Sequence, residues 1–150
     1  MKKALAAFLS RAAKLELTSA EHYDQLAGQM AKLQLRDTEL LFRDFAGMSR
    51  LHYRDIVTLA DQRKLDLAEI VSGDCPDLDS IGDPQSLRSP YNAILHGKEI
   101  ENRVRDYYLQ VAASDTDAEV RQVAADFAYE EEKHIDILDE WIAITPRLQS

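Results

Sequence analysis

Glutamate and tyrosine residues recur in this sequence at a spacing that places them on one face of a helix. Glu16 lies seven residues before Tyr23, and Glu101 lies seven residues before Tyr108. Because seven residues are about two turns of an α-helix, each glutamate shares a face with its tyrosine. The other residues of these two faces are mostly apolar or small, so the pattern predicts that both carboxylates point into a protein core.

Histidine joins the carboxylates in two other segments. Glu131 and His134 lie three residues apart within the apolar stripe of residues 120–141. This spacing places both side chains on one helix face, close enough to share a metal ion. His52 lies in the apolar stripe of an earlier segment. Carboxylates balance the charge of metal cations, and imidazole suits iron and manganese.

The inward-facing stripes contain no matching set of lysine or arginine residues. A buried carboxylate is costly unless it is paired, neutralised or bound to a metal. A single core histidine is usually satisfied by a hydrogen bond, but the joint pattern of acidic and imidazole groups favours metal ligation. The predicted ligands are Glu16, His52, Glu101, Glu131 and His134.

Several other residues are candidates for an accessory role or for none. Glu130 lies in a run of three glutamates and offers a spare carboxylate, although such runs usually form a solvated face. Tyr23 and Tyr108 are interpreted as core residues with satisfied hydroxyl groups rather than as redox residues. His22 and His96 have no comparable cluster around them in the sequence, and we expect both to be exposed.

Four long helices must position these residues. Apolar side chains recur in steps of three and four, which predicts helices at about 3–33, 37–63, 89–113 and 116–144. The scarcity of glycine (5) and proline (4) favours long uninterrupted helices. Residues suited to helix N-caps precede three of these segments: Asp37 with Thr38, Ser89 with Pro90, and Thr116 with Glu119.

The connection between the second and third helices is unusually long. Residues 64–88 contain Gly73, Pro76, Gly82 and Pro84, which predicts a crossover with one short helix at Leu67 to Val71. Short loops within each helix pair make the paired helices antiparallel. The sequence therefore predicts one all-α domain over residues 1–150, an antiparallel four-helix bundle with one long crossover between helices 2 and 3.

The net charge and the cysteine content limit the classes of partner and site that this protein could have. The net charge of -9 argues against binding to nucleic acid or to anionic membranes. The single cysteine, Cys75, excludes a thiolate metal centre and an internal disulfide, and its isolation fits a cytoplasmic location. No stretch of the sequence approaches the length of a membrane span.

In these features the chain resembles the rubrerythrin-like branch of the ferritin-like superfamily. The resemblance covers nearly the whole chain. Its matching pieces are Glu16 to Tyr23, Leu41-Phe42 to His52, Glu101 to Tyr108, and Ala128-x-x-Glu131-x-x-His134. The resemblance implies a ferritin-like bundle with a site for one or two metal ions, iron above all, with manganese or zinc as alternatives.

The resemblance also implies a role for each ligand. Glu16 and Glu101 would be terminal ligands, Glu131 would bridge two metal ions, and His52 and His134 would each bind one. The second bridging glutamate of the family maps onto Ser49 in this chain. That departure leaves four alternatives: a weakened site, a mononuclear site, a site of altered metal preference, or a ligand position filled by water or an anion.

Two other departures bear on activity. Rubrerythrins carry a cysteine-rich electron-donating domain, which this chain does not contain, so the electron donor is unknown. They also carry an extra carboxylate one turn from the main ligand of the third helix. In this chain Lys98 and Val104 stand at that spacing from Glu101. A standard rubrerythrin peroxidase cycle is therefore not expected.

Three functions remain after these considerations. The first is a non-haem iron oxidoreductase that acts as a ferroxidase or scavenges oxygen or peroxide. The second is a non-catalytic, mononuclear metal-binding or sensing bundle. The third, an iron-storage cage, ranks lowest because no clear fifth helix follows the fourth. We expect a homodimer, in which the apolar residues Phe42, Tyr53 and Tyr107 face outward onto a partner or pack under the crossover.

Overall fold

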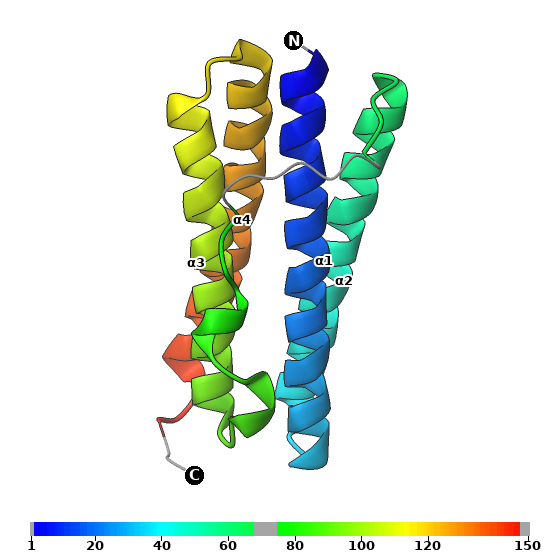
Figure 1. Cartoon of the computed structure of the whole chain (residues 1–150). Helices are drawn as coiled ribbons and strands as arrows, with labels where there is room; N and C mark the ends of the chain where they lie inside the picture. Colours follow the sequence, from blue (N-terminus) through cyan, green and yellow to red (C-terminus); the bar gives the residue numbers. More distant parts are fainter. Residues whose placement is uncertain (1, 68–74, 148–150) are drawn as a thin grey trace.

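The computed structural model describes residues 2–67 and 75–147, and the described residues contain four long helices and no strand. The long helices are α1 (Lys2–Lys32), α2 (Arg36–Gln62), α3 (Pro90–Ser114) and α4 (Ala118–Ile144) (Figure 1). Two short 3-10 turns, η1 (Asp79–Ile81) and η2 (Pro84–Ser86), lie between α2 and α3. The short helix expected at Leu67 to Val71 falls largely at 68–71, outside the described residues.

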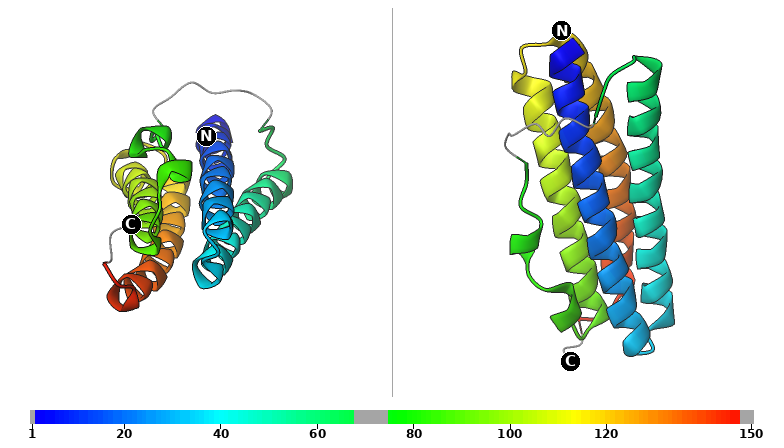
Figure 2. Two further views of the ribbon diagram at one scale, coloured as in Figure 1. Left: turned by 90° about the horizontal axis from the view of Figure 1, so that it is seen from below. Right: turned by 45° about the vertical axis from the view of Figure 1, so that its right-hand side comes forward.

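The helices form two antiparallel hairpins that lie side by side, α1 with α2 and α3 with α4 (Figures 1 and 2). Short connections join the helices within each hairpin. The crossover leads from the end of α2 to the opposite end of the bundle, where α3 begins, so α2 and α3 run in the same direction. The expected all-α, antiparallel four-helix bundle with one long crossover is confirmed.

The helix starts differ from the expected caps at two places. At the start of α2, Gln34 adopts a left-handed backbone (φ 59) and turns the chain directly into the helix. As a result α2 begins at Arg36 without a side-chain cap, and the expected Asp37–Thr38 cap is wrong. At the start of α4, the N-cap is Asp117, whose carboxylate accepts a hydrogen bond from the Val120 amide.

The expected cap at Thr116 is therefore also wrong. Thr116 lies one residue before the N-cap position of α4. Asp117 occupies that position, and its carboxylate reaches the amide three residues ahead. The start of α3 follows the sequence pattern. Ser89 accepts a hydrogen bond from the Asn92 amide at 3.1 Å, and Pro90 occupies the first turn.

A continuous apolar core runs along the bundle and includes clustered aromatic rings. One cluster contains Tyr23, Phe42 and Phe45, and the rings of Tyr23 and Phe42 stack with centroids 6.2 Å apart.

Phe42 and Tyr107 are both buried, so the alternative in which they face outward onto a partner is wrong. Tyr107 lines a groove together with Cys75 and Pro76 of the crossover, which agrees with the other alternative. The Tyr107 hydroxyl accepts a hydrogen bond from Arg11 Nε at 2.9 Å.

None of the helices in the described part of the chain has an apolar stretch long enough to cross a membrane.

Gly97 lies where α3 comes close to buried aromatic rings. A Cβ atom at this position would lie 3.3 Å from Cε1 of Tyr23 and 3.4 Å from Cε1 of Phe42. Both rings are fully buried and have little room to move. We expect Gly97→Ala to lower the free energy of unfolding by about 1–3 kcal/mol in urea denaturation.

The matched control is Gly28→Ala in α1, where an added Cβ would meet nothing within 4 Å. This variant should gain about 0.5–1 kcal/mol, because alanine has the higher helix propensity. Equal stability of the two variants would contradict the close approach of α3 to the rings.

Candidate metal centre

Each of the four helices contributes to a cluster of acidic and imidazole groups inside the bundle. Glu16 of α1, Glu101 of α3 and Glu131 of α4 are each only 2% exposed. His52 of α2 and His134 of α4 are half-buried. All five residues that the sequence pattern predicts as ligands therefore lie within or at the edge of the core, and direct contacts join them in two groups.

The first group joins α1 to α2. Nδ1 of His52 lies 2.9 Å from Oε2 of Glu16. The same carboxylate oxygen accepts a hydrogen bond of 2.9 Å from the hydroxyl of Tyr108 on α3. Among the described residues, Nε2 of His52 is buried and has no hydrogen-bond partner.

The second group joins α3 to α4. Nδ1 of His134 lies 2.9 Å from Oε1 of Glu101 and 3.1 Å from Oε2 of Glu131. One ligand atom from each of these three residues lies within 4.8 Å of the other two, a separation that lets all three contact one metal ion. The hydroxyl of Tyr23 donates a hydrogen bond of 2.7 Å to Oε2 of Glu101.

The repeated spacing of glutamate and tyrosine in the sequence corresponds to a pair of contacts between α1 and α3. Because α1 and α3 are antiparallel, the tyrosine of each helix reaches the glutamate of the other: Tyr23 contacts Glu101, and Tyr108 contacts Glu16. Burial, followed by the nearby carboxylates, raises the pKa of Tyr23 and of Tyr108 well above the usual value. Both hydroxyls therefore keep their protons and orient the carboxylates as hydrogen-bond donors.

The cluster holds more acidic groups than a metal-free core would tolerate fully ionised. Burial, together with the charges of Glu101 and Glu16, raises the pKa of Glu131 well above its usual value, and His134 opposes this only in part. Burial lowers the pKa of His134, but its contacts with Glu101 and Glu131 outweigh burial and raise it to about 10. Protons therefore balance the charge, and a bound cation would displace them.

This balance predicts how the stability of the metal-free protein depends on pH. The pKa of His134 is about 10 in the folded protein, against an ordinary value of 6.5 for a solvated histidine. Its contribution to stability is therefore complete below the lower value and is lost as the pH rises through the upper one. The raised pKa of Glu131 acts in the same direction. We expect the free energy of unfolding, measured in chelator, to fall from about pH 7 to about pH 10.

Urea denaturation at a series of pH values measures this dependence. The His134→Gln variant removes the imidazole and should flatten the curve above about pH 7. A wild-type curve that rises over this interval would contradict the assigned charge balance.

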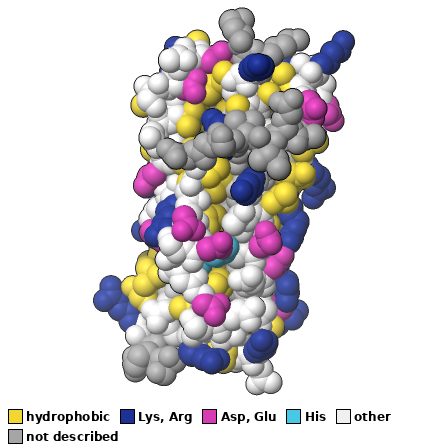
Figure 3. Space-filling view, in the orientation of Figure 1, with side chains coloured by type: hydrophobic (Ala, Val, Ile, Leu, Met, Phe, Trp, Pro, Cys, Tyr) yellow, Lys and Arg dark blue, Asp and Glu magenta, His cyan; other side chains and the backbone are white. Residues whose placement is uncertain are grey.

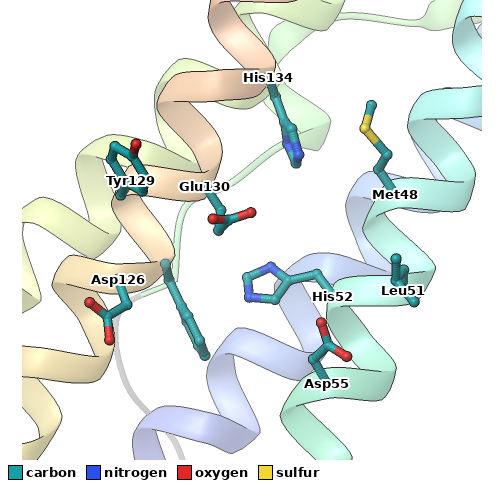
Figure 4. Close-up of a pocket in the computed structure, with 9 residues that line it drawn as sticks. Met48, Leu51, His52, Asp55, Asp126, Tyr129, Glu130 and His134 are labelled. Carbon is teal, nitrogen blue, oxygen red and sulfur yellow. The ribbon is translucent and has the colours of Figure 1, made fainter.

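A groove between α2 and α4 leads to the two site histidines (Figure 4). The groove has a volume of about 540 Å³, and His52 and His134 approach it from opposite helices. Its walls include the apolar side chains of Met48 and Leu51. The sequence pattern did not predict this groove, because residues on the outer faces of the helices gave no periodic signal for it.

The accessory candidates occupy different positions. Ser49 is 5% exposed and lies one turn before His52, so its side chain faces the interior. Glu130 is exposed and pairs with Lys133 at 2.7 Å, but it also lines the groove. It therefore lies beside the cluster rather than within it.

The other two histidines are buried, contrary to the expectation from the sequence. His22 is 5% exposed and His96 is 7% exposed. The crossover turn η1 covers this region, since Asp79 of η1 lies 2.9 Å from Nε2 of His22. Burial by a segment that is distant in the sequence leaves no trace in helical periodicity.

Comparison with solved structures confirms the expected ferritin-like fold. The crystal structure of an uncharacterised conserved protein from Magnetospirillum magnetotacticum MS-1 matches with a TM-score of 0.78 and 36% sequence identity, over 97% of each chain. The chain belongs to the family of this conserved protein. No protein-family profile and no curated protein matches the sequence.

Two structures of PmFTN variants, both soaked in iron, share the fold at lower identity. Their TM-scores are 0.70 and 0.71, with 17% sequence identity in each case. The matches cover 93% and 94% of this chain, and 86% and 87% of the PmFTN chains. PmFTN and this chain therefore share the fold.

Proposed function

We propose that the chain is a rubrerythrin-like member of the superfamily that binds iron at Glu16, His52, Glu101, Glu131 and His134. The observation that carries the proposal is the buried group of Glu101, Glu131 and His134, whose ligand atoms lie within 4.8 Å of one another. A mixed set of carboxylates and imidazoles suits iron. PmFTN, which shares the fold, was studied in crystals soaked in iron, so iron is the first metal to test.

We further propose that the site is an oxidoreductase centre for oxygen or peroxide, acting as a ferroxidase or as a scavenger. Bound ferrous iron would supply the electrons that such an oxidant takes up. The groove beside His52 and His134 offers a path to the site for a small oxidant. Tyr23 and Tyr108 hold the carboxylates of Glu101 and Glu16 in place and keep their own protons.

Oxidant consumption tests this activity. Protein loaded with ferrous iron under anaerobic conditions is mixed with oxygen or with hydrogen peroxide, and consumption is followed against the Glu131→Gln variant. We expect consumption by the wild type to exceed that of the variant and of free ferrous iron. Intact iron loading without consumption would refute the oxidoreductase and leave the metal site standing.

The unequal halves of the cluster favour a second candidate, a non-catalytic bundle that holds one metal ion. Three acidic or imidazole side chains meet in the α3–α4 group, whereas the contact between α1 and α2 joins two of them, Glu16 and His52. Ser49 contributes no carboxylate to the weaker half. Metal analysis that finds one tightly held ion per chain, with no oxidant consumption, would support this candidate.

A homodimer is also proposed. Leu40 and Leu51 of α2 and Tyr129 of α4 are 44%, 55% and 65% exposed. Burial of such side chains against a second copy would remove apolar surface from water. Sedimentation velocity should detect a dimer, and Leu51→Glu together with Tyr129→Glu should convert it to a monomer. A monomeric wild type would refute the proposal.

A further inference from the structure

A second pair of imidazole groups lies outside the carboxylate cluster, between α1 and α3. Nδ1 of His22 faces Nε2 of His96 at 3.4 Å, and the ring centroids are 5.6 Å apart. Both residues are buried beneath the crossover, at 5% and 7% exposure. On this side of the molecule, histidine atoms reach the surface between acidic side chains (Figure 3).

The crossover orients one of the two rings. Oδ1 of Asp79 lies 2.9 Å from Nε2 of His22, so this nitrogen carries the proton that the carboxylate accepts. In the neutral ring the lone pair then sits on Nδ1, the nitrogen that faces His96. Histidine ligands of metals usually donate their other ring N–H to a carboxylate in this way.

The separation of the two facing nitrogens fits a shared metal ion. A hydrogen bond between protein groups is typically about 2.9–3.0 Å long, so 3.4 Å is long for one. Two nitrogens that each lie about 2.0–2.1 Å from a tetrahedral metal ion are roughly 3.3–3.4 Å apart. We propose that His22 and His96 bind a transition-metal dication such as Zn²⁺, with Asp79 orienting His22 and water completing the coordination.

The surrounding charges are compatible with a cation at this position. Asp83 and Glu99 both favour positive charge at His96. Arg103 opposes it, but its guanidinium is paired with Glu99 at 2.9 Å. Burial, followed by His22 and Arg103, lowers the pKa of His96 to about 4, so the imidazole is neutral and free of proton competition at neutral pH.

This site would differ in role from the central cluster, because it includes the crossover. Asp79 belongs to η1, and Arg103 of α3 also holds this segment through hydrogen bonds to the carbonyl oxygen of Asp77 and the hydroxyl of Ser80. An ion on His22 and His96 would therefore fasten the crossover to α1 and α3. The expected consequence is slower amide hydrogen exchange in η1 when the ion is bound.

Zn²⁺ titration followed by ¹⁵N NMR of the histidine rings tests the proposal. The His134→Gln variant serves as the parent protein, because it disables the three-residue group of the central site. We expect Zn²⁺ to shift the resonances of Nδ1 of His22 and Nε2 of His96, while Nε2 of His22 keeps its proton. Calorimetry should find a Zn²⁺ class that is lost when His96→Gln is added.

Two further variants separate ligation from general effects. Asp79→Asn should weaken Zn²⁺ binding about 10-fold or more, as expected for loss of a carboxylate behind a ligating histidine. Glu21→Gln, which removes an exposed carboxylate next to His22 in the sequence, is the matched control and should leave affinity unchanged. Wild-type protein, shown to be folded by circular dichroism, is measured in parallel.

The outcome that would overturn the proposal is a folded wild-type protein whose His22 and His96 ring nitrogens do not respond to Zn²⁺. The pair would then be a chain of hydrogen bonds from His96 through His22 to Asp79. Because the NMR signals are assigned to individual rings, Zn²⁺ binding at the central cluster alone would count as this negative result.

Discussion

Glu131→Gln is expected to weaken iron binding by about 100-fold or more and, at the same time, to stabilise the metal-free protein. The weaker binding follows because Glu131 belongs to the three-residue group around His134, and an amide is a poorer ligand for iron than a carboxylate. Anaerobic iron titration followed by metal analysis measures this effect.

The gain in stability has the opposite physical origin. The carboxyl of Glu131 is 2% exposed, and its pKa is raised by burial and by the charges of Glu101 and Glu16. A neutral amide of similar size removes this repulsion and the cost of burying a charge. We expect the free energy of unfolding in chelator to rise by about 1 kcal/mol or more at neutral pH.

The matched control is the neighbouring substitution, Glu130→Gln. Glu130 is exposed, and its ion pair with Lys133 lies at the surface. Loss of this ion pair should change the free energy of unfolding by at most about 0.5 kcal/mol. Its removal should also leave iron affinity within a few-fold of the wild type. Similar losses of iron in both variants would contradict the placement of the site around Glu131.

Ser49→Glu is expected to raise the iron content from about one toward about two ions per chain. Ser49 is buried one turn before His52, on the helix that contributes no carboxylate to the cluster. A glutamate at this position would add a carboxylate ligand and strengthen the half formed by Glu16 and His52. Metal analysis after anaerobic loading and desalting gives the stoichiometry.

The same substitution should destabilise the metal-free protein by about 3 kcal/mol or more, because it adds an uncompensated charge to an acidic core. Iron should restore most of this loss, since binding to the folded state alone stabilises it. Ser49→Gln is the control for size: it should share the packing cost without gaining the second ion. Unchanged stoichiometry in Ser49→Glu would contradict the assignment of this position.

Much of the fold followed from local sequence patterns. The helical stripes identified the inward positions of Glu16, Glu101 and Glu131, and all three are buried. This succeeds because side chains spaced three or four residues apart share a helix face whatever surrounds the helix. Ser89 and Pro90 marked the start of α3 for the same reason, since a cap acts on the amides of its own first turn.

Several of the predictions that failed concern contacts between distant segments. His22 and His96 were expected at the surface, but the crossover covers them, and Asp79 reaches His22 across 57 residues of sequence. Phe42 was expected to face outward, but it packs on the ring of Tyr23. The start of α2 also depends on a tight turn rather than on its polar residues.

The sequence alone therefore determined the helical bundle, its long crossover and the inward carboxylates and histidines. Only the tertiary structure decided how these groups pair, because pairing depends on the register of one helix against another. It placed Tyr23 on Glu101 and Tyr108 on Glu16, and it opened the groove between α2 and α4. It also brought His22 and His96 together, a contact that no periodicity along one helix records.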